Sequence, residues 1–210
     1  MKASAITAIL AFTATALSAP TKSYTHPSIT PRSIFSKRSV QDAVNDCNSN
    51  SQNPELCEQV VTAIGGWDTS VNTVNNFLNI ANSLSGQDLT DNELAALRAA
   101  NAEPGFLNTL MNTPGLSQAG VDAANTLMQV FPGVPQNLVE LTNSEIFVSD
   151  AVDNINTLRC SSPGDSNILE NIGILWVESA AAVGADTPGT PLGPDFCPKS
   201  PNTGDGYGGN

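Results

Sequence analysis

Apolar side chains recur every three or four residues along most of the chain, and this spacing limits its fold more than any other feature. Such spacing places the apolar residues on one face of an α-helix. The alternation typical of half-buried β-strands is hard to find, and no Asn-Gly or Asp-Gly turn joins two apolar runs. We therefore predict an all-α fold: a single compact bundle of about six helices with disulfides and an irregular C-terminal arm. The clearest stripe contains Trp67, Val71, Val74, Leu78, Ala81 and Leu84.

Capping and turn residues divide this pattern into separate helices. The run Thr90-Asp91-Asn92-Glu93 has the form of a capping box, which predicts a helix start. Pro104 is expected to open a short helix, because proline suits the first turn of a helix. Pro114-Gly115 is expected to end that helix.

The composition changes after the last apolar stripe. That stripe runs from Ile168 to Val183, with Asp165 or Ser166 as the expected N-cap and Gly184 as the expected C-cap. From residue 185 onward Pro, Gly, Thr and Asn dominate. We therefore expect a helical domain over 39–184 and an irregular arm over 185–210.

The first 18 residues have the order of a secretory signal peptide. Lys2 supplies a positive start, an apolar run follows to Leu17, and Ala16-Leu17-Ser18 has small residues at the cleavage positions. A cut after Ala19 and an N-terminal helix of the fold are the alternatives. The run is shorter than the roughly 20 residues that span a bilayer, so we expect an exported protein without a transmembrane segment.

A basic segment over 19–38 follows the signal peptide. It ends in Lys37-Arg38, which resembles a site for the dibasic-specific proteases of the secretory pathway. Removal of residues 1–38 would leave Arg98, Arg159 and Lys199 against 20 acids, a net charge of −17 and no histidine. The alternative is an exposed linker that is never cut. An acidic chain of this kind is a poor match for nucleic acid, whose phosphates require clustered Lys and Arg.

Four cysteines provide the second constraint. In an exported chain they are expected to form disulfides, and we favour Cys47–Cys57 and Cys160–Cys197. The first pair would join two neighbouring helices, and the second would tie the Pro-rich arm to a long helix. A crossed pairing stays open. Zinc binding is disfavoured because the cysteines form no close pairs, and a catalytic thiol would lack a histidine to activate it.

Catalytic arrangements are few in this sequence. Without histidine, the usual Ser-His-Asp and Cys-His sites are absent from the expected processed chain, and we expect no cofactor or metal. Carboxylates remain: Glu55 with Glu58, and Asp150 with Asp153, share a helix face. We expect these acids to lie on the solvent-exposed faces of their helices. A hydrolase that uses two carboxylates is the less favoured alternative.

Trp67 and Trp176 are the candidate residues for an apolar ligand pocket. Each lies in an apolar helical stripe, so packing in the core is the favoured interpretation. A helical bundle that carries a lipid or another hydrophobic ligand between its helices is the alternative.

The layout as a whole resembles that of small secreted proteins of filamentous fungi. The resemblance rests on the signal peptide, the segment ending in Lys37-Arg38, the acidic helical body and Cys197-Pro198 near the end. Some helical members of this group bind cell walls or hydrophobic surfaces, and others act on a host. The resemblance implies a non-enzymatic protein of the extracellular space or cell wall, acting by binding a partner whose identity stays open. It assigns no functional residue.

Overall fold

Two neighbouring caps start the helical part of the chain. Ser39 caps α1 (Val40–Asn50): its backbone N–H donates to Asp42 Oδ2 at 3.0 Å, and its Oγ accepts from the Asp42 N–H at 3.1 Å. Asn53 caps α2 (Pro54–Ile80), and Pro54 occupies the first helical turn, where no N–H bond is needed. The two helices are joined by a disulfide between Cys47 and Cys57.

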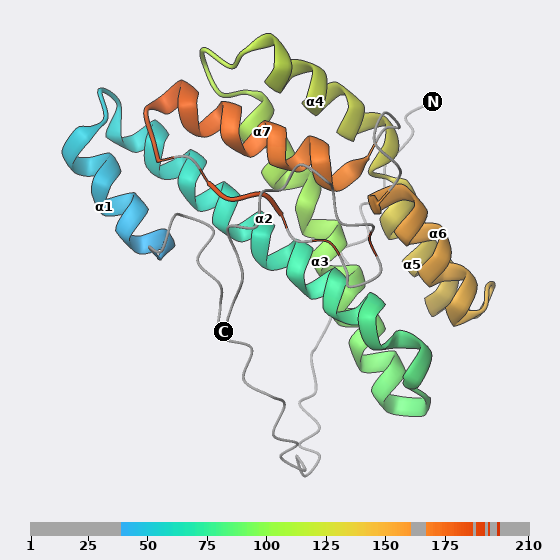
Figure 1. The fold of residues 1–210 in the computed structure, drawn as a ribbon. Helices are drawn as coiled ribbons and strands as arrows, with labels where there is room; N and C mark the ends of the chain where they lie inside the picture. Colours follow the sequence, from blue (N-terminus) through green and yellow to red (C-terminus); the bar gives the residue numbers. More distant parts are fainter. Residues whose placement is uncertain (1–38, 161–166, 187, 192, 194–196, 198–210) are drawn as a thin grey trace, which may run out of the picture. The chain divides into compact units, whose positions relative to one another are not determined.

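The computed structural model describes residues 39–160, 167–186, 188–191, 193 and 197 (Figure 1). These residues form seven α-helices and a short 3-10 helix, joined by turns and irregular segments, with no β-strand among them, so the expected all-α fold is confirmed. The expected signal peptide 1–18 with Ser18, the segment 19–38 with Lys37 and Arg38, and most of the arm 185–210 lie outside this part of the chain.

The remaining elements follow in order after α2. They are the 3-10 helix η1 (Ala81–Ser83), α3 (Gly86–Met111), α4 (Gln118–Val130), α5 (Gly133–Thr142), α6 (Val148–Cys160) and α7 (Ile168–Val183). A second disulfide joins Cys160 at the end of α6 to Cys197. Both disulfides have the pairing that the sequence favoured.

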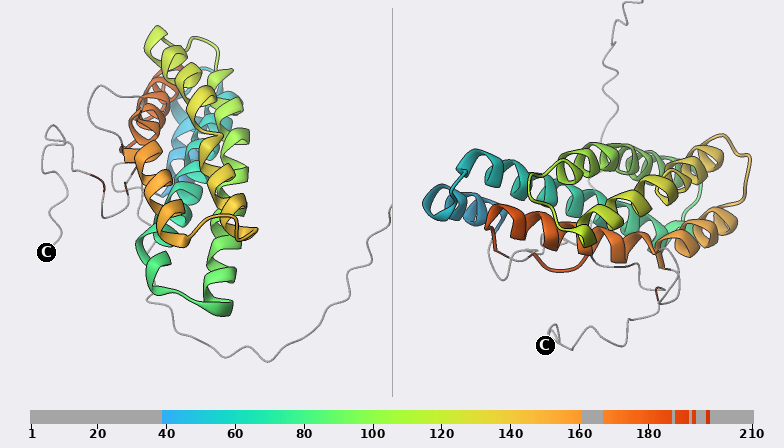
Figure 2. Two further views of the ribbon diagram at one scale, coloured as in Figure 1. Left: turned by 90° about the vertical axis from the view of Figure 1, so that its right-hand side faces the viewer. Right: turned by 90° about the horizontal axis from the view of Figure 1, so that it is seen from above.

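The two longest helices form the centre of the bundle. After η1, α3 turns back along α2, and the two helices lie side by side (Figure 2). Gly66 permits this close approach, because a Cβ there would lie 2.6 Å from Phe106 Cε1 of α3. Gly65 on α2 likewise permits the close approach of α1, because a Cβ there would lie 2.6 Å from Val40 Cγ2. The glycine pair therefore lets helices approach α2 from two sides.

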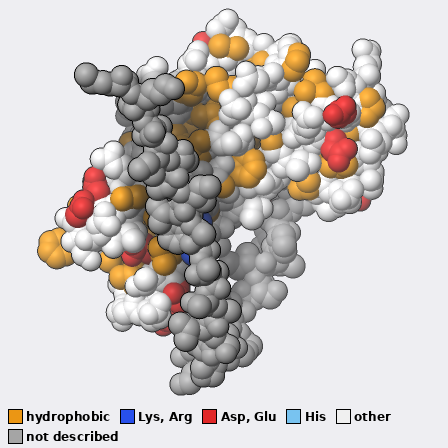
Figure 3. Space-filling model, turned by 180° about the vertical axis from the view of Figure 1, so that it is seen from behind, with side chains coloured by type: hydrophobic (Ala, Val, Ile, Leu, Met, Phe, Trp, Pro, Cys, Tyr) orange, Lys and Arg blue, Asp and Glu red, His pale blue; other side chains and the backbone are white. Residues whose placement is uncertain are grey.

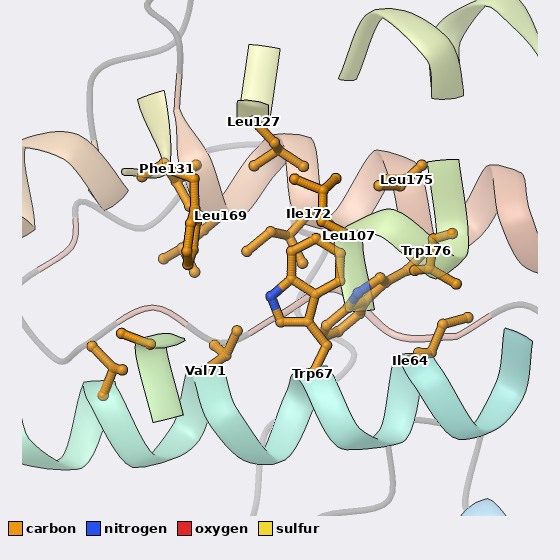
Figure 4. Packing of buried hydrophobic residues seen from close by; sticks show 14 of the residues in the cluster. Ile64, Trp67, Val71, Leu107, Leu127, Phe131, Leu169, Ile172, Leu175 and Trp176 are labelled. Atoms are coloured by element: carbon orange, nitrogen blue, oxygen red, sulfur yellow. The ribbon is translucent and has the colours of Figure 1, made fainter. Parts of the chain in front are cut away.

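The remaining helices pack around this centre. Helix α7 contacts α4 and α2, while α5 and α6 lie against each other (Figure 1). Buried side chains of α2, α3, α4 and α7 fill the interior between them (Figure 4). Their labelled members are Ile64, Trp67, Val71, Leu107, Leu127, Phe131, Leu169, Ile172, Leu175 and Trp176.

Two expected helix starts are wrong. Helix α3 begins at Gly86, so Thr90 and Glu93 lie inside it, and Pro104 lies inside it as well. An internal proline costs about 3 kcal/mol or more because it lacks an N–H and crowds the preceding turn. The apolar stripe continues across Pro104 on the buried face through Ala100 and Leu107, and this packing offsets the cost.

The boundaries of α7 lie close to their expected positions. Gly184 is the C-cap with φ +70°, as the sequence predicted. The N-cap is Asn167 rather than Asp165 or Ser166, because its Oδ1 accepts from the N–H groups of Leu169 and Glu170. None of the helices in the described ranges is both long and apolar enough to cross a membrane.

Candidate functional site

Trp67 and Trp176 lie together in the core. Both indoles are fully buried, and their ring centroids are 6.3 Å apart at an interplanar angle of 70°. Figure 4 shows them edge to face between α2 and α7, surrounded by aliphatic side chains. The structure thus brings the two residues into contact and places them where the packing interpretation expected them.

A buried carboxylate touches this indole pair. Glu103 on α3 is 0 % exposed, and Trp67 Nε1 donates a hydrogen bond of 2.7 Å to its Oε2. Burial raises the pKa of the Glu103 carboxyl from its ordinary value of 4.5 to about 7. The positive charge of Arg159 and the bond from Trp67 both act to lower this pKa, but burial is the larger effect.

Arg159 on α6 is the positive counterpart of Glu103. It is also 0 % exposed, and its Nη2 donates to Asn75 Oδ1 at 2.8 Å and to the Val71 carbonyl oxygen at 3.4 Å. Burial lowers the pKa of the guanidinium, and the charge of Glu103 raises it. We call Glu103 and Arg159 the buried charge pair.

Several polar atoms of these buried side chains have no hydrogen-bond partner among the residues that the structure describes. They are Glu103 Oε1, Arg159 Nε and Nη1, and Trp176 Nε1. Such atoms are costly inside a protein, because they have lost their bonds to water without replacement. With a pKa of about 7, the Glu103 carboxyl can gain or lose a proton near neutral pH.

Neither member of the buried charge pair was predicted from the sequence, although the spacing of the apolar residues contains a signal for both. Glu103 falls in step with the stripe of Ala96, Ala100, Leu107 and Leu110, and Arg159 falls in step with Val152 and Ile155. A charged residue that is fully buried usually needs a partner, so a charge on an apolar stripe is a candidate for a buried polar contact.

The carboxylate pairs expected from the sequence lie apart from this cluster. Glu55, Glu58, Asp150 and Asp153 are all exposed on the surfaces of α2 and α6. A sugar hydrolase needs two carboxylates on opposite sides of a cleft, with pKa values held apart. Within the described ranges, no group of three or more His, Cys, Asp or Glu is placed to hold a metal ion.

The most exposed large apolar side chain among the described residues is Phe147, which is 79 % exposed. It directly precedes α6, and its carbonyl oxygen accepts the Ala151 N–H at 3.0 Å. Glu145 and Asp150 beside it are exposed, and Glu140 is half-buried. We call Glu140, Glu145, Phe147 and Asp150 the α5–α6 tip.

The backbone of the α5–α6 tip is well defined. Helix α5 ends with the Ser144 N–H donating to the Leu141 carbonyl and the Glu145 N–H donating to the Glu140 carbonyl, both at 2.8 Å. Ser144 has a φ of +59°, the left-handed conformation that this helix ending requires. Seen from behind, hydrophobic and acidic side chains lie next to each other along the edge of the molecule on which α5 and α6 lie (Figure 3).

Comparisons with known proteins give no further assignment. No family model matches the chain, and neither a curated protein nor a solved structure matches it significantly.

Proposed function

We propose that the chain is an exported, non-enzymatic protein that acts by binding, and that its α5–α6 tip docks a basic segment of a partner protein. The observation that carries this proposal is the exposure of Phe147 among carboxylates. Aromatic side chains are enriched at the centres of protein interfaces, where they contribute much of the binding energy.

The charges of the α5–α6 tip favour a cationic partner. Glu145 and Asp150 lie within three residues of Phe147 in the chain, Glu140 lies near the end of α5, and the face of an aromatic ring also attracts cations. The chain carries a net charge of −12, and Arg98 is the only exposed cation among the described residues. A second copy of the chain would therefore be repelled, whereas a Lys- or Arg-rich segment with an apolar side chain would be attracted.

Other observations support export and argue for binding at the surface. Two disulfides are typical of proteins from oxidising compartments. The indoles that the lipid-carrier alternative would place in a ligand pocket pack on each other instead. The acids that the hydrolase alternative would use are exposed on helix surfaces. Binding at the exposed tip is the function that these contacts favour.

The test is binding of an amphipathic peptide of Lys and Leu to the immobilised protein, with the matching Glu and Leu peptide as the reference. We expect only the basic peptide to bind. Phe147→Ser should weaken that binding by about tenfold, since it removes the apolar anchor and leaves the charges in place. Met128→Ser is the matched control, because Met128 on α4 is also exposed, at 53 %.

Two results would overturn the proposal. One is the same loss of affinity in Phe147→Ser and Met128→Ser, which would place the contact elsewhere. The other is equal binding of the basic and the acidic peptide, which would remove the charge argument.

A further inference from the structure

Helix α1 starts almost directly after the two basic residues Lys37-Arg38. Ser39 is its N-cap and is exposed, and the backbone of Ser39 is extended, with φ −72° and ψ 162°. Val40 is the first helical residue. The peptide bond between Arg38 and Ser39 therefore lies one residue before the helix, where a protease specific for paired basic residues would cut.

We propose that the Arg38–Ser39 bond is a processing site of the folded protein, and that the capped first turn of α1 sets the rate at which this bond is cut. The enzyme is an endoprotease specific for paired basic residues. It adds water across the peptide bond, so that Arg38 gains a carboxylate and Ser39 gains an ammonium group.

The hydrogen bonds of the first turn oppose the cut. Whether a protease can cut a backbone depends on how that backbone is buried and hydrogen-bonded, because the active site holds the chain in extended form. The Ser39 carbonyl oxygen accepts the N–H groups of Asp42 at 3.1 Å and Ala43 at 3.2 Å. These bonds have to break before the residues after Ser39 can extend. When opening and closing are fast relative to cutting, the rate follows the population of opened chains.

The side chain of Asp42 holds this turn closed. Its Oδ2 accepts one hydrogen bond from the Ser39 N–H at 3.0 Å and another from the Ser39 Oγ at 2.9 Å. In the other direction, the Asp42 N–H donates to Ser39 Oγ at 3.1 Å. The two residues thus form a capping box, which stabilises the start of the helix. The opened chain is therefore rarer with the capping box than without it.

A contact with α2 holds the same turn. Val40 is half-buried and packs against the core. A Cβ at Gly65 of α2 would lie 2.6 Å from Val40 Cγ2 and 3.1 Å from Val40 Cγ1. Because both methyl groups are involved and the valine side chain is stiff, rotation about its χ1 would not relieve such a contact. Val40 therefore fits in this position because residue 65 is glycine, and opening of the turn has to move it away.

The nitrogen of Ser39 keeps its partner after the cut. It becomes an ammonium group, so its hydrogen bond to Asp42 Oδ2 becomes charge-assisted, and such bonds are stronger than those of a neutral N–H. The capping box that slows the cut therefore also holds the new amino terminus on α1.

The test is cleavage of the intact, disulfide-bonded chain by a purified endoprotease of this specificity, followed by mass spectrometry. We expect the first cut after Arg38. Asp42→Ala should raise its rate about fivefold, the change that the loss of one capping interaction produces. Asp42→Glu is the matched control, because glutamate is the usual partner in a capping box, and it should keep the rate of the unmodified protein.

A short peptide of residues 33–44 separates the effect of the fold from the sequence preference of the protease. A peptide of this length does not hold a stable helix in water. Asp42→Ala in the peptide should therefore leave the rate unchanged. An equal increase in the peptide and in the protein would assign the effect to the sequence alone and would overturn the proposal.

Gly65→Ala tests the same turn from outside the segment that the protease reads. It should displace Val40 and raise the rate as Asp42→Ala does. Gly105→Ala is the matched control, since a Cβ there meets no atom within 4 Å, and it should leave the rate unchanged. A rate that fails to rise in Asp42→Ala or in Gly65→Ala, or a first cut at another bond, would contradict the proposal. These results do not depend on whether the α5–α6 tip binds a partner.

Discussion

Glu103 gives the folded state as a whole a pH dependence. Its pKa is about 7 in the bundle and 4.5 as the ordinary value, so the folded chain binds the proton more tightly than the unfolded chain. The resulting stabilisation is complete below the lower value and is lost as the pH rises through the higher one. Acid therefore favours folding of the whole chain.

We predict that the thermal midpoint rises when the pH is lowered from about 8 to about 5. The size of the effect is on the order of 3 kcal/mol, since each pKa unit corresponds to about 1.4 kcal/mol. Glu103→Gln should remove most of this rise, because the side chain no longer titrates. Calorimetry over that pH range measures it, and a midpoint of the unmodified protein that falls steadily in acid would contradict it.

At the residue scale, the apolar stripes predicted which apolar side chains are buried, but they did not show what the charged residues on the same stripes contact. The stripes placed Trp67 and Trp176 in the core, where the structure has them. They did not single out Glu103 and Arg159, which are buried on the same stripes. Their partners are 36 residues away for Glu103 and 84 for Arg159, and periodicity along one helix carries no information at that range.

At the element scale, the turn after α5 places a serine, Ser144, in a backbone conformation that favours glycine. Ser144 adopts φ +59°, a conformation that costs most residues about 1–2 kcal/mol and glycine almost nothing. Ser144→Gly should therefore stabilise the protein, by less than about 1 kcal/mol, since glycine also gives the unfolded chain more freedom.

Urea unfolding measures this change, with Ser149→Gly as the control. Ser149 is exposed in the first turn of α6, where glycine should lower the free energy of unfolding by up to about 1 kcal/mol. A loss of stability in both variants would show that the conformation of Ser144 is not strained.

Helix boundaries were predictable where a cap acts locally and unpredictable where packing decides. Gly184 ends α7 because only a left-handed residue fits there, and its sequence context showed this. Pro104 does not begin a helix, because the apolar face of α3 continues across it and packs against α2. The expected helical bundle is confirmed, but the helix starts expected at Thr90 and Pro104 lie inside the single helix α3.

At the scale of the whole molecule, the net charge of −12 acts against the compact state. Among the described residues, Arg98 is exposed and Arg159 is buried, so the surface acids have few cations to offset them. We predict that raising sodium chloride from about 20 mM to about 500 mM raises the thermal midpoint, because salt screens repulsion between exposed charges.

Differential scanning calorimetry at pH 7.5 checks this prediction, with potassium chloride at the same ionic strength as the control. The two salts should act equally, since screening depends on ionic strength. A midpoint that falls with salt would show that attractive surface pairs outweigh the repulsion.

The connectivity of the two disulfides has a consequence for the order in which the chain can mature. Each bond joins cysteines that are consecutive along the chain, so the two loops neither overlap nor interlock. A chain that enters an oxidising compartment amino end first presents Cys47 and Cys57 before Cys160 has appeared. The simplest rule, in which each cysteine pairs with the next one to arrive, then yields the native bonds without any later exchange.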